Sequence, residues 1–208
     1  MKSEIKLISG AMVMLALSTS ALVVLPYMQV HDVAPTPGLK PYTSAELRGR
    51  AVYIRSGCVY CHSQQPRAKN FAPADFSRGW GRATVAGDYA YDTPHLLGTM
   101  RTGPDLMNIG VRQPSDQWHL GHLYQPRAYS PGSNMPGFPF LFETKPKADK
   151  DDVVVKLPPG YTPANTVVVA RQDALDLVKY LLSLNRSFPV VAAPPAATAP
   201  AAPAPVKP

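Results

Sequence analysis

The sequence predicts a mainly α-helical domain that follows one N-terminal membrane-spanning helix and precedes a disordered tail. Residues 7–30 carry no charged side chain, and these 24 residues are enough to cross a hydrocarbon core of about 30 Å as a helix. Apolar residues recur at helical spacing over 172–184. After Pro189 the chain is almost entirely Ala, Pro and Val, a composition that cannot build a core. We therefore divide the chain into an anchor (1–30), a linker (31–43), a globular domain (44–188) and an Ala/Pro tail (189–208).

The N-terminal stretch is open to two readings, a cleaved signal peptide or a retained anchor. A signal peptide has an apolar core of roughly 7–15 residues followed by small residues at its cleavage site. Residues 18–20 resemble such a site, but the apolar run resumes with 21–25, which favours an anchor. Lys2 and Lys6 precede the span, so the positive-inside rule places the N-terminus in the cytoplasm and the rest of the chain on the other side.

Within the domain, few segments show a clear period. A helix is expected over 45–56, capped by Thr43 or Ser44, and it is expected to pack on the helix at 172–184 with Gly49 at the close approach. The intervening chain is rich in Gly and Pro, so a bound group is expected to help organise it. The remaining expected elements are a linker stiffened by its prolines, a short helix over 115–124, and short strands at 153–155 and 167–169.

Composition excludes several function classes. Lys and Arg total 21 against 14 Asp and Glu, a formal charge of +7, with no basic stripe interleaved with aromatic residues, so a nucleic-acid partner is not expected. The 2 cysteines are too few for a disulfide scaffold or for an ordinary structural zinc site. A redox dithiol of the thioredoxin kind would need a βαβ context that the sequence does not show.

The two cysteines form the motif Cys58-Val59-Tyr60-Cys61-His62, the attachment motif for a c-type haem. Two intervening residues bring both sulfur atoms to one side of a helical turn, where each can form a thioether with a vinyl group. His62, next in sequence, is then aimed at the iron. The sequence therefore predicts one covalent haem c on Cys58 and Cys61, with His62 as an axial ligand.

A second axial ligand must come from elsewhere in the chain. Met135 lies in a stretch broken by Pro131, Gly132, Pro136 and Gly137, so it is expected to be presented to the iron rather than packed in a helix. A His/Met pair fills both axial positions and suits electron transfer. The other candidates are Met100, Met107, His95, His119 and His122, of which Met107 is expected to be a packing residue.

An iron-bound histidine normally donates its other ring N–H to an acceptor that fixes its orientation. The carbonyl of Pro104, in the turn that follows Gly103, is the expected acceptor for His62. Two further features stay open. His119 and His122 share a helical face that could bind a metal or simply lie at an interface, and Arg101 and Arg127 could neutralise a haem propionate or be solvated.

Several blocks together resemble the monohaem subunit, subunit II, of cbb3-type cytochrome c oxidases. The likeness covers roughly residues 1–143. The blocks are Gly49-Arg50-x-x-Tyr53-x-x-x-Gly57-Cys58-x-x-Cys61-His62-Ser63-Gln64, Val85-Ala86-Gly87-Asp88, Arg101-Thr102-Gly103-Pro104-Asp105-Leu106, Trp118-His119-x-x-His122-Leu123-Tyr124-x-Pro126-Arg127 and Ser133-x-Met135-Pro136.

The resemblance implies a class I cytochrome c fold in the bacterial inner membrane, with a single span and the haem domain on the periplasmic side. It also implies that the chain passes electrons to a catalytic haem–copper subunit, supplied by another cytochrome c subunit or a soluble cytochrome c. Only the complex would then be an enzyme. The sequence differs from the family pattern at Gln65-Pro66-Arg67, over 144–170 and in the tail.

Three other functions stay open. The first is the anchored monohaem subunit of a nitric oxide reductase, the second a haem sensor with an open iron position, and the third a structural subunit whose haem only stabilises the fold.

Overall fold

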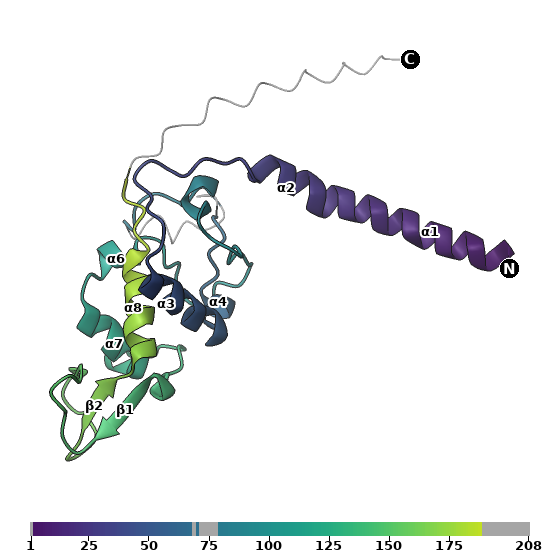
Figure 1. Ribbon diagram of the computed structural model, residues 1–208. Coiled ribbons are helices and arrows are strands. Elements are labelled where there is room, and N and C mark those ends of the chain that lie inside the picture. Colours follow the sequence, from purple (N-terminus) through teal and green to yellow (C-terminus); the bar gives the residue numbers. More distant parts are fainter. Residues whose placement is uncertain (1, 68–69, 71–78, 189–208) are drawn as a thin grey trace.

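The protein consists of a long N-terminal helix set apart from a mainly helical domain (Figure 1). A computed structural model describes residues 2–67, 70 and 79–188. The Ala/Pro tail expected at 189–208 lies outside the described residues. Within the described chain the helical class is confirmed, with a single short pair of strands.

The N-terminal helix is continuous, but one turn of it is π-helical rather than α-helical. An α-helix (α1, Lys2–Thr19) passes into a π-helical turn (η1, Ser20–Val24) and then into a second α-helix (α2, Leu25–Val30). Pro26 has no N–H to donate into the preceding turn, and Leu25 N–H bonds to the carbonyl of Ser20 instead, which widens the helix there. The apolar stretch Ser3–Gln29 is long enough to cross a membrane, and none of it is buried against the domain.

The segment that follows this helix is extended and lies against the domain. Thr36 is only 5% exposed, and its N–H bonds to the carbonyl of Gly87 at 3.1 Å. Gly87 lies in a short 3-10 helix (η2, Ala86–Tyr89), and a Cβ on it would come within 2.8 Å of the carbonyl oxygen of Ala34. The close approach of two backbones therefore requires glycine at this position.

A charged pair secures the same contact. Arg82 forms a two-point ion pair with Asp88, at 2.7 and 2.8 Å, and Asp88 also accepts a hydrogen bond from the Thr36 side chain. Arg82 donates to the carbonyl of Phe188 at 3.1 Å, and Phe188 packs on Gly38. The linker is thus held at both Thr36 and Gly38.

The predicted pairing of two long helices is confirmed. The first of them (α3, Ser44–Arg55) begins with a capping box between Thr43 and Glu46, and the second is α8 (Gln172–Ser183). A Cβ on Gly49 would lie 1.9 Å from the carbonyl oxygen of Asp176, so only glycine lets the two backbones come so close. The helices are also joined by Arg48, which donates two hydrogen bonds to the buried Asp176.

The chain between these helices forms short elements. The predicted helix near 115–124 is present as α7 (Asp116–Tyr124), capped by Ser115. The other short elements are α4 (Cys58–Cys61), α6 (Ile109–Arg112), η3 (Pro126–Ala128) and η4 (Pro139–Leu141).

The two observed strands agree only in part with the strands predicted from the sequence. The predicted strand at 167–169 forms (β2, Val167–Ala170), but its partner is β1 (Phe142–Lys145), in antiparallel register with Phe142 opposite Ala170. The segment 153–155 contributes only an isolated bridge between Val154 and Val169. Residues 142–145 are one apolar residue followed by three polar ones, so they show no apolar/polar alternation that would predict a strand.

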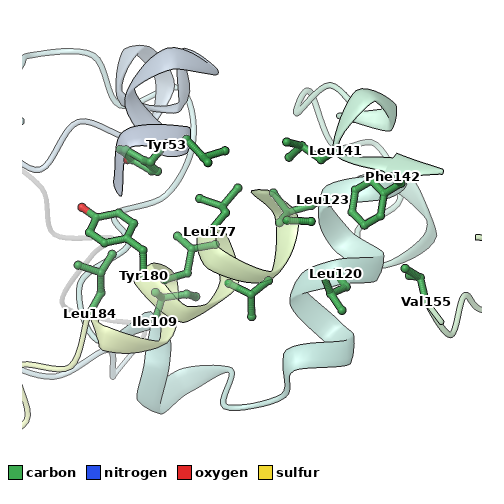
Figure 2. Packing of buried hydrophobic residues seen from close by; sticks show 14 of the residues in the cluster. Tyr53, Ile109, Leu120, Leu123, Leu141, Phe142, Val155, Leu177, Tyr180 and Leu184 are labelled. Atoms are coloured by element: carbon green, nitrogen blue, oxygen red, sulfur yellow. The ribbon is translucent and has the colours of Figure 1, made fainter. Parts of the chain in front are cut away.

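One buried cluster joins all parts of the domain (Figure 2). Tyr53 from α3 meets Tyr180 from α8 edge to face, with ring centroids 5.5 Å apart. Leu120 and Leu123 of α7 and Phe142 of β1 complete the cluster on the other side. Cys58, Val59 and Met135 all pack against this cluster.

Candidate functional site

The two cysteines lie on a single helical turn directly after α3. Gly57 ends α3 in the left-handed region, with φ of 74°, a conformation that glycine adopts without strain. The chain then forms α4 (Cys58–Cys61), and the spacing of three places both thiols on one side of the turn. Both thiols are free, Cys58 partly buried and Cys61 exposed.

The environment of Cys58 argues against a redox dithiol. Burial raises the pKa of Cys58 to about 11, so the sulfur carries its proton at neutral pH. Reactive CxxC pairs have a lowered pKa because the thiolate is the attacking species.

His62 follows the turn and is held at both backbone and ring. Its N–H bonds to the carbonyl of Cys58 at 2.8 Å, and its own carbonyl accepts a hydrogen bond of 2.6 Å from the buried Tyr53 hydroxyl. Burial lowers the pKa of His62, so the imidazole is neutral at pH 7 and carries one N–H. Nδ1 lies 2.8 Å from the carbonyl oxygen of Pro104 and must be the donor, because a carbonyl only accepts. Nε2 therefore keeps its lone pair and can bind a metal.

Gly103 sets the distance between the Pro104 turn and His62. Gly103 N–H bonds to the carbonyl of Cys61 at 3.0 Å. A Cβ on Gly103 would lie 2.2 Å from Cε1 of His62 and within 2.7 Å of both ring nitrogens. The face of the His62 imidazole thus packs directly against the backbone of Gly103.

Charged side chains fix the rest of this turn. Asp105 receives a 2.7 Å hydrogen bond from Arg101 and one of 2.8 Å from Met107 N–H, while Arg112 donates to the Asp105 carbonyl at 2.6 Å. Arg101 also donates to the carbonyl of Gln65 at 2.7 Å, and its side chain is only 6% exposed. Arg101 therefore braces the turn behind His62, whereas Arg127 is exposed.

The loop of Met135 is fastened to the end of α7. Phe138 N–H bonds to the carbonyl of Leu123 at 2.9 Å, and a Cβ on Gly137 would lie 2.6 Å from the carbonyl oxygen of Tyr124. Within the loop, Met135 N–H bonds to Oγ of Ser133 at 3.2 Å. Met135 is partly buried and borders the same cluster as Cys58 and Leu106.

The other candidate ligands have different surroundings. Met107 is buried in the core, and Met100 is 58% exposed. His95 is exposed, and Nε2 of His119 lies 2.8 Å from the carbonyl of Gln113, which makes it a structural donor. Among the residues that the structure describes, no three His, Cys, Asp or Glu side chains gather around a possible metal ion.

Two residues of this site were not singled out for their contacts from the sequence. Tyr53 holds the His62 carbonyl, and Gly103 makes room for the imidazole ring. Both belong to the sequence blocks quoted above. The residue type at neither position indicates its contact, because the contacts arise only when distant segments meet.

Comparison with known proteins adds independent information. The family model described as "Cytochrome C oxidase, mono-heme subunit/FixO" matches residues 1–159. This match extends beyond residue 143 and includes β1 and the bridge at Val154, part of the region expected to depart from the family. A search of curated proteins gave no match to the chain.

Proposed function

The chain belongs to the FixO family of mono-haem cytochrome c oxidase subunits, and on this basis we propose that it carries one covalent haem c and passes electrons to the catalytic haem–copper subunit of a cbb3-type oxidase. The observation that carries this proposal is the state of His62. Its Nδ1 donates a hydrogen bond to the carbonyl oxygen of Pro104, which leaves Nε2 available to bind a metal. His62 directly follows the helical turn that carries the two free thiols.

The residues at the site fit a c-type haem in a class I cytochrome c fold. Cys58 and Cys61 would hold the porphyrin through thioethers, and His62 Nε2 would bind the iron. Met135 would supply the second axial ligand from a loop that is bonded to α7 through Leu123. When bound, the haem supplies a centre that accepts and gives up one electron.

The chain's own residues would keep this centre six-coordinate and in place. Tyr53 and Pro104 hold His62 at its carbonyl and its ring, so the imidazole cannot turn away from the iron. The thioether of Met135 favours Fe(II) relative to a second nitrogen ligand, which raises the reduction potential. With both axial positions filled, the site has no position for a substrate, so the chain would relay electrons and the complex would perform the chemistry.

The N-terminal helix supports a single-pass location in the bacterial inner membrane. Lys2 and Lys6 would keep the N-terminus cytoplasmic, which places the haem domain in the periplasm. From there it would receive electrons from another cytochrome c subunit or from a soluble cytochrome c.

Mild detergent purification from native membranes tests the proposal. We expect the chain to retain a haem after denaturing electrophoresis and to co-purify with a large subunit that contains haem and copper. The preparation should consume oxygen in a cyanide-sensitive reaction. Non-haem iron in place of copper would instead identify a nitric oxide reductase, and isolation as a lone cytochrome would refute the oxidase assignment.

Substitutions of methionine test the ligand assignment. Met135→His should lower the reduction potential and slow electron entry, because the second ligand becomes a nitrogen. Met100→His, at an exposed methionine, is the matched control and should keep the wild-type potential. Readily bound carbon monoxide in the ferrous wild-type chain would contradict the six-coordinate assignment and favour a sensor.

A further inference from the structure

His122 is a second histidine built into the site, and the proposed function does not use it. Its ring stacks on Trp118, with centroids 4.6 Å apart and planes at 10°, and meets the Tyr129 ring edge to face at 6.0 Å. Tyr129 can come this close because residue 121 is glycine, where a Cβ would lie 1.8 Å from the Tyr129 hydroxyl. The imidazole is therefore clamped between two aromatic rings.

One nitrogen of this clamped ring lacks a partner. Nδ1 of His122 is buried and forms no hydrogen bond within the part of the chain that the structure describes. Its aromatic neighbour Tyr129 already donates to the carbonyl of Lys156 at 3.1 Å. Buried polar atoms are nearly always hydrogen-bonded, so this nitrogen is expected to meet a group that is not part of these residues.

His122 lies on α7 beside the attachment point of the Met135 loop. The next residue, Leu123, accepts the hydrogen bond from Phe138 that fastens the Met135 loop to α7. Burial, and to a lesser extent the neighbouring His119 and His62, lowers the pKa of His122 to about 4. The neutral ring carries one N–H at pH 7.

We propose that Nδ1 of His122 donates a hydrogen bond to a propionate carboxylate of the bound haem. This inference rests on the proposed function, because it requires the haem. The propionates are the strong hydrogen-bond acceptors on the edge of a haem, and a carboxylate in a partly buried site needs donors. Nε2 of His119, three residues away on the same helix, already lies 2.8 Å from the carbonyl oxygen of Gln113.

The bond has a consequence for the iron. A donor to the propionate offsets part of its negative charge, and that charge otherwise favours Fe(III). His122 is thus a positioning residue that also raises the reduction potential.

Three variants of the full-length, haem-loaded chain in detergent test the inference. His122→Phe keeps a ring to stack on Trp118 and removes the donor. His122→Asn places an amide nitrogen near the position of Nδ1 and should restore the bond. His119→Asn is the matched control, because it alters a buried histidine of the same helix that bonds only within the chain.

Two measurements separate the outcomes. The infrared difference spectrum of reduction, recorded with labelled propionates, should show a shifted carboxylate band in His122→Phe and the wild-type band in His122→Asn and His119→Asn. At a fixed applied potential, the ratio of Fe(II) to Fe(III) should fall about three- to tenfold in His122→Phe, the larger change corresponding to roughly 59 mV for one electron.

An unchanged carboxylate band and potential in His122→Phe would overturn the inference while leaving the proposed function intact. An unchanged band with a shifted potential would also overturn it, since His122 would then bond to water or another group. A wild-type chain that lacks covalent haem would refute both.

Discussion

Replacing Gly103 with alanine tests how the protein orients His62. The new Cβ would lie 2.2 Å from Cε1 of the imidazole, more than 1 Å closer than the roughly 3.5 Å at which carbon atoms attract each other. The backbone of Gly103 is itself bonded to the carbonyl of Cys61, so the methyl group cannot move away freely. The imidazole must turn, and its 2.8 Å hydrogen bond to Pro104 is lost or weakened.

The expected cost follows from these two effects. Overpacking of a well-filled site costs about 1–3 kcal/mol, and the net loss of a hydrogen bond costs about 1 kcal/mol. We therefore expect Gly103→Ala to lower the free energy of unfolding of the domain by about 2–4 kcal/mol. If His62 ligates the iron as proposed, an imidazole without its acceptor at Nδ1 would be a poorer donor to the iron, which would destabilise Fe(III) and raise the reduction potential.

Urea unfolding of the haem-loaded chain and a spectroelectrochemical titration measure the two quantities. Gly98→Ala is the control, because a Cβ there would meet its nearest neighbour, Cβ of Ser63, at 3.3 Å, a mild contact that a shift of a few tenths of an ångström relieves. The reasoning fails if Gly103→Ala and Gly98→Ala unfold within about 0.5 kcal/mol of each other and the potential of Gly103→Ala matches wild type.

Three further predictions concern other parts of the site and the linker. Tyr53→Phe leaves the carbonyl of His62 without its donor and should destabilise the domain by about 1–3 kcal/mol in urea unfolding; an unchanged midpoint would show that the bond is replaced. If Met135 is the second axial ligand, Met135→Ala should open one axial position, so the ferrous variant should bind carbon monoxide whereas the wild type should not; equal binding would mean another residue is the ligand. Burial opposes ionisation of Asp88, but the hydrogen bonds and charge of Arg82, together with hydrogen bonds from Val85 N–H and the Thr36 side chain, outweigh it and lower the pKa of Asp88. The pKa of Asp88 in the folded state lies below its unfolded value of about 4. Ionised Asp88 therefore stabilises the fold above pH 4, and this contribution is lost as the pH falls further. Asp88→Asn should reduce the pH dependence of the free energy of unfolding measured from pH 6 to pH 2. A pH dependence equal to that of the wild type would contradict the assignment.

The parts of the fold that could be predicted are those with a local cause. The helix Gln172–Ser183 has apolar residues at regular spacing, and Thr43 with Glu46 forms a cap that the sequence displays. The contact between His62 and Pro104 could be expected because a ligating imidazole needs an acceptor on its other nitrogen.

Features that depend on distant partners could not be predicted in this way. The strand Phe142–Lys145 exists because Val167–Ala170 lies beside it, and its own four residues carry no distinct pattern. His119 and His122 look alike in the sequence, yet one bonds to Gln113 and the other has a buried nitrogen that finds no partner among the described residues. Only the packing of α7 separates their roles.

Because the linker is hydrogen-bonded to the domain at Thr36, the domain is held closer to the N-terminal helix than the full linker would allow. A flexible tether of the length of 31–43 would have an end-to-end distance of roughly 20 Å, but only 31–35 precede the contact with Gly87, which reduces this to about 12 Å. The volume that the domain can explore shrinks about fivefold, and its effective concentration at any site within reach rises by the same factor. Partners out of reach of this short tether are excluded whatever their affinity. If the chain relays electrons as proposed, the few hydrogen bonds around Asp88 would limit its electron partners to those within reach of this short tether.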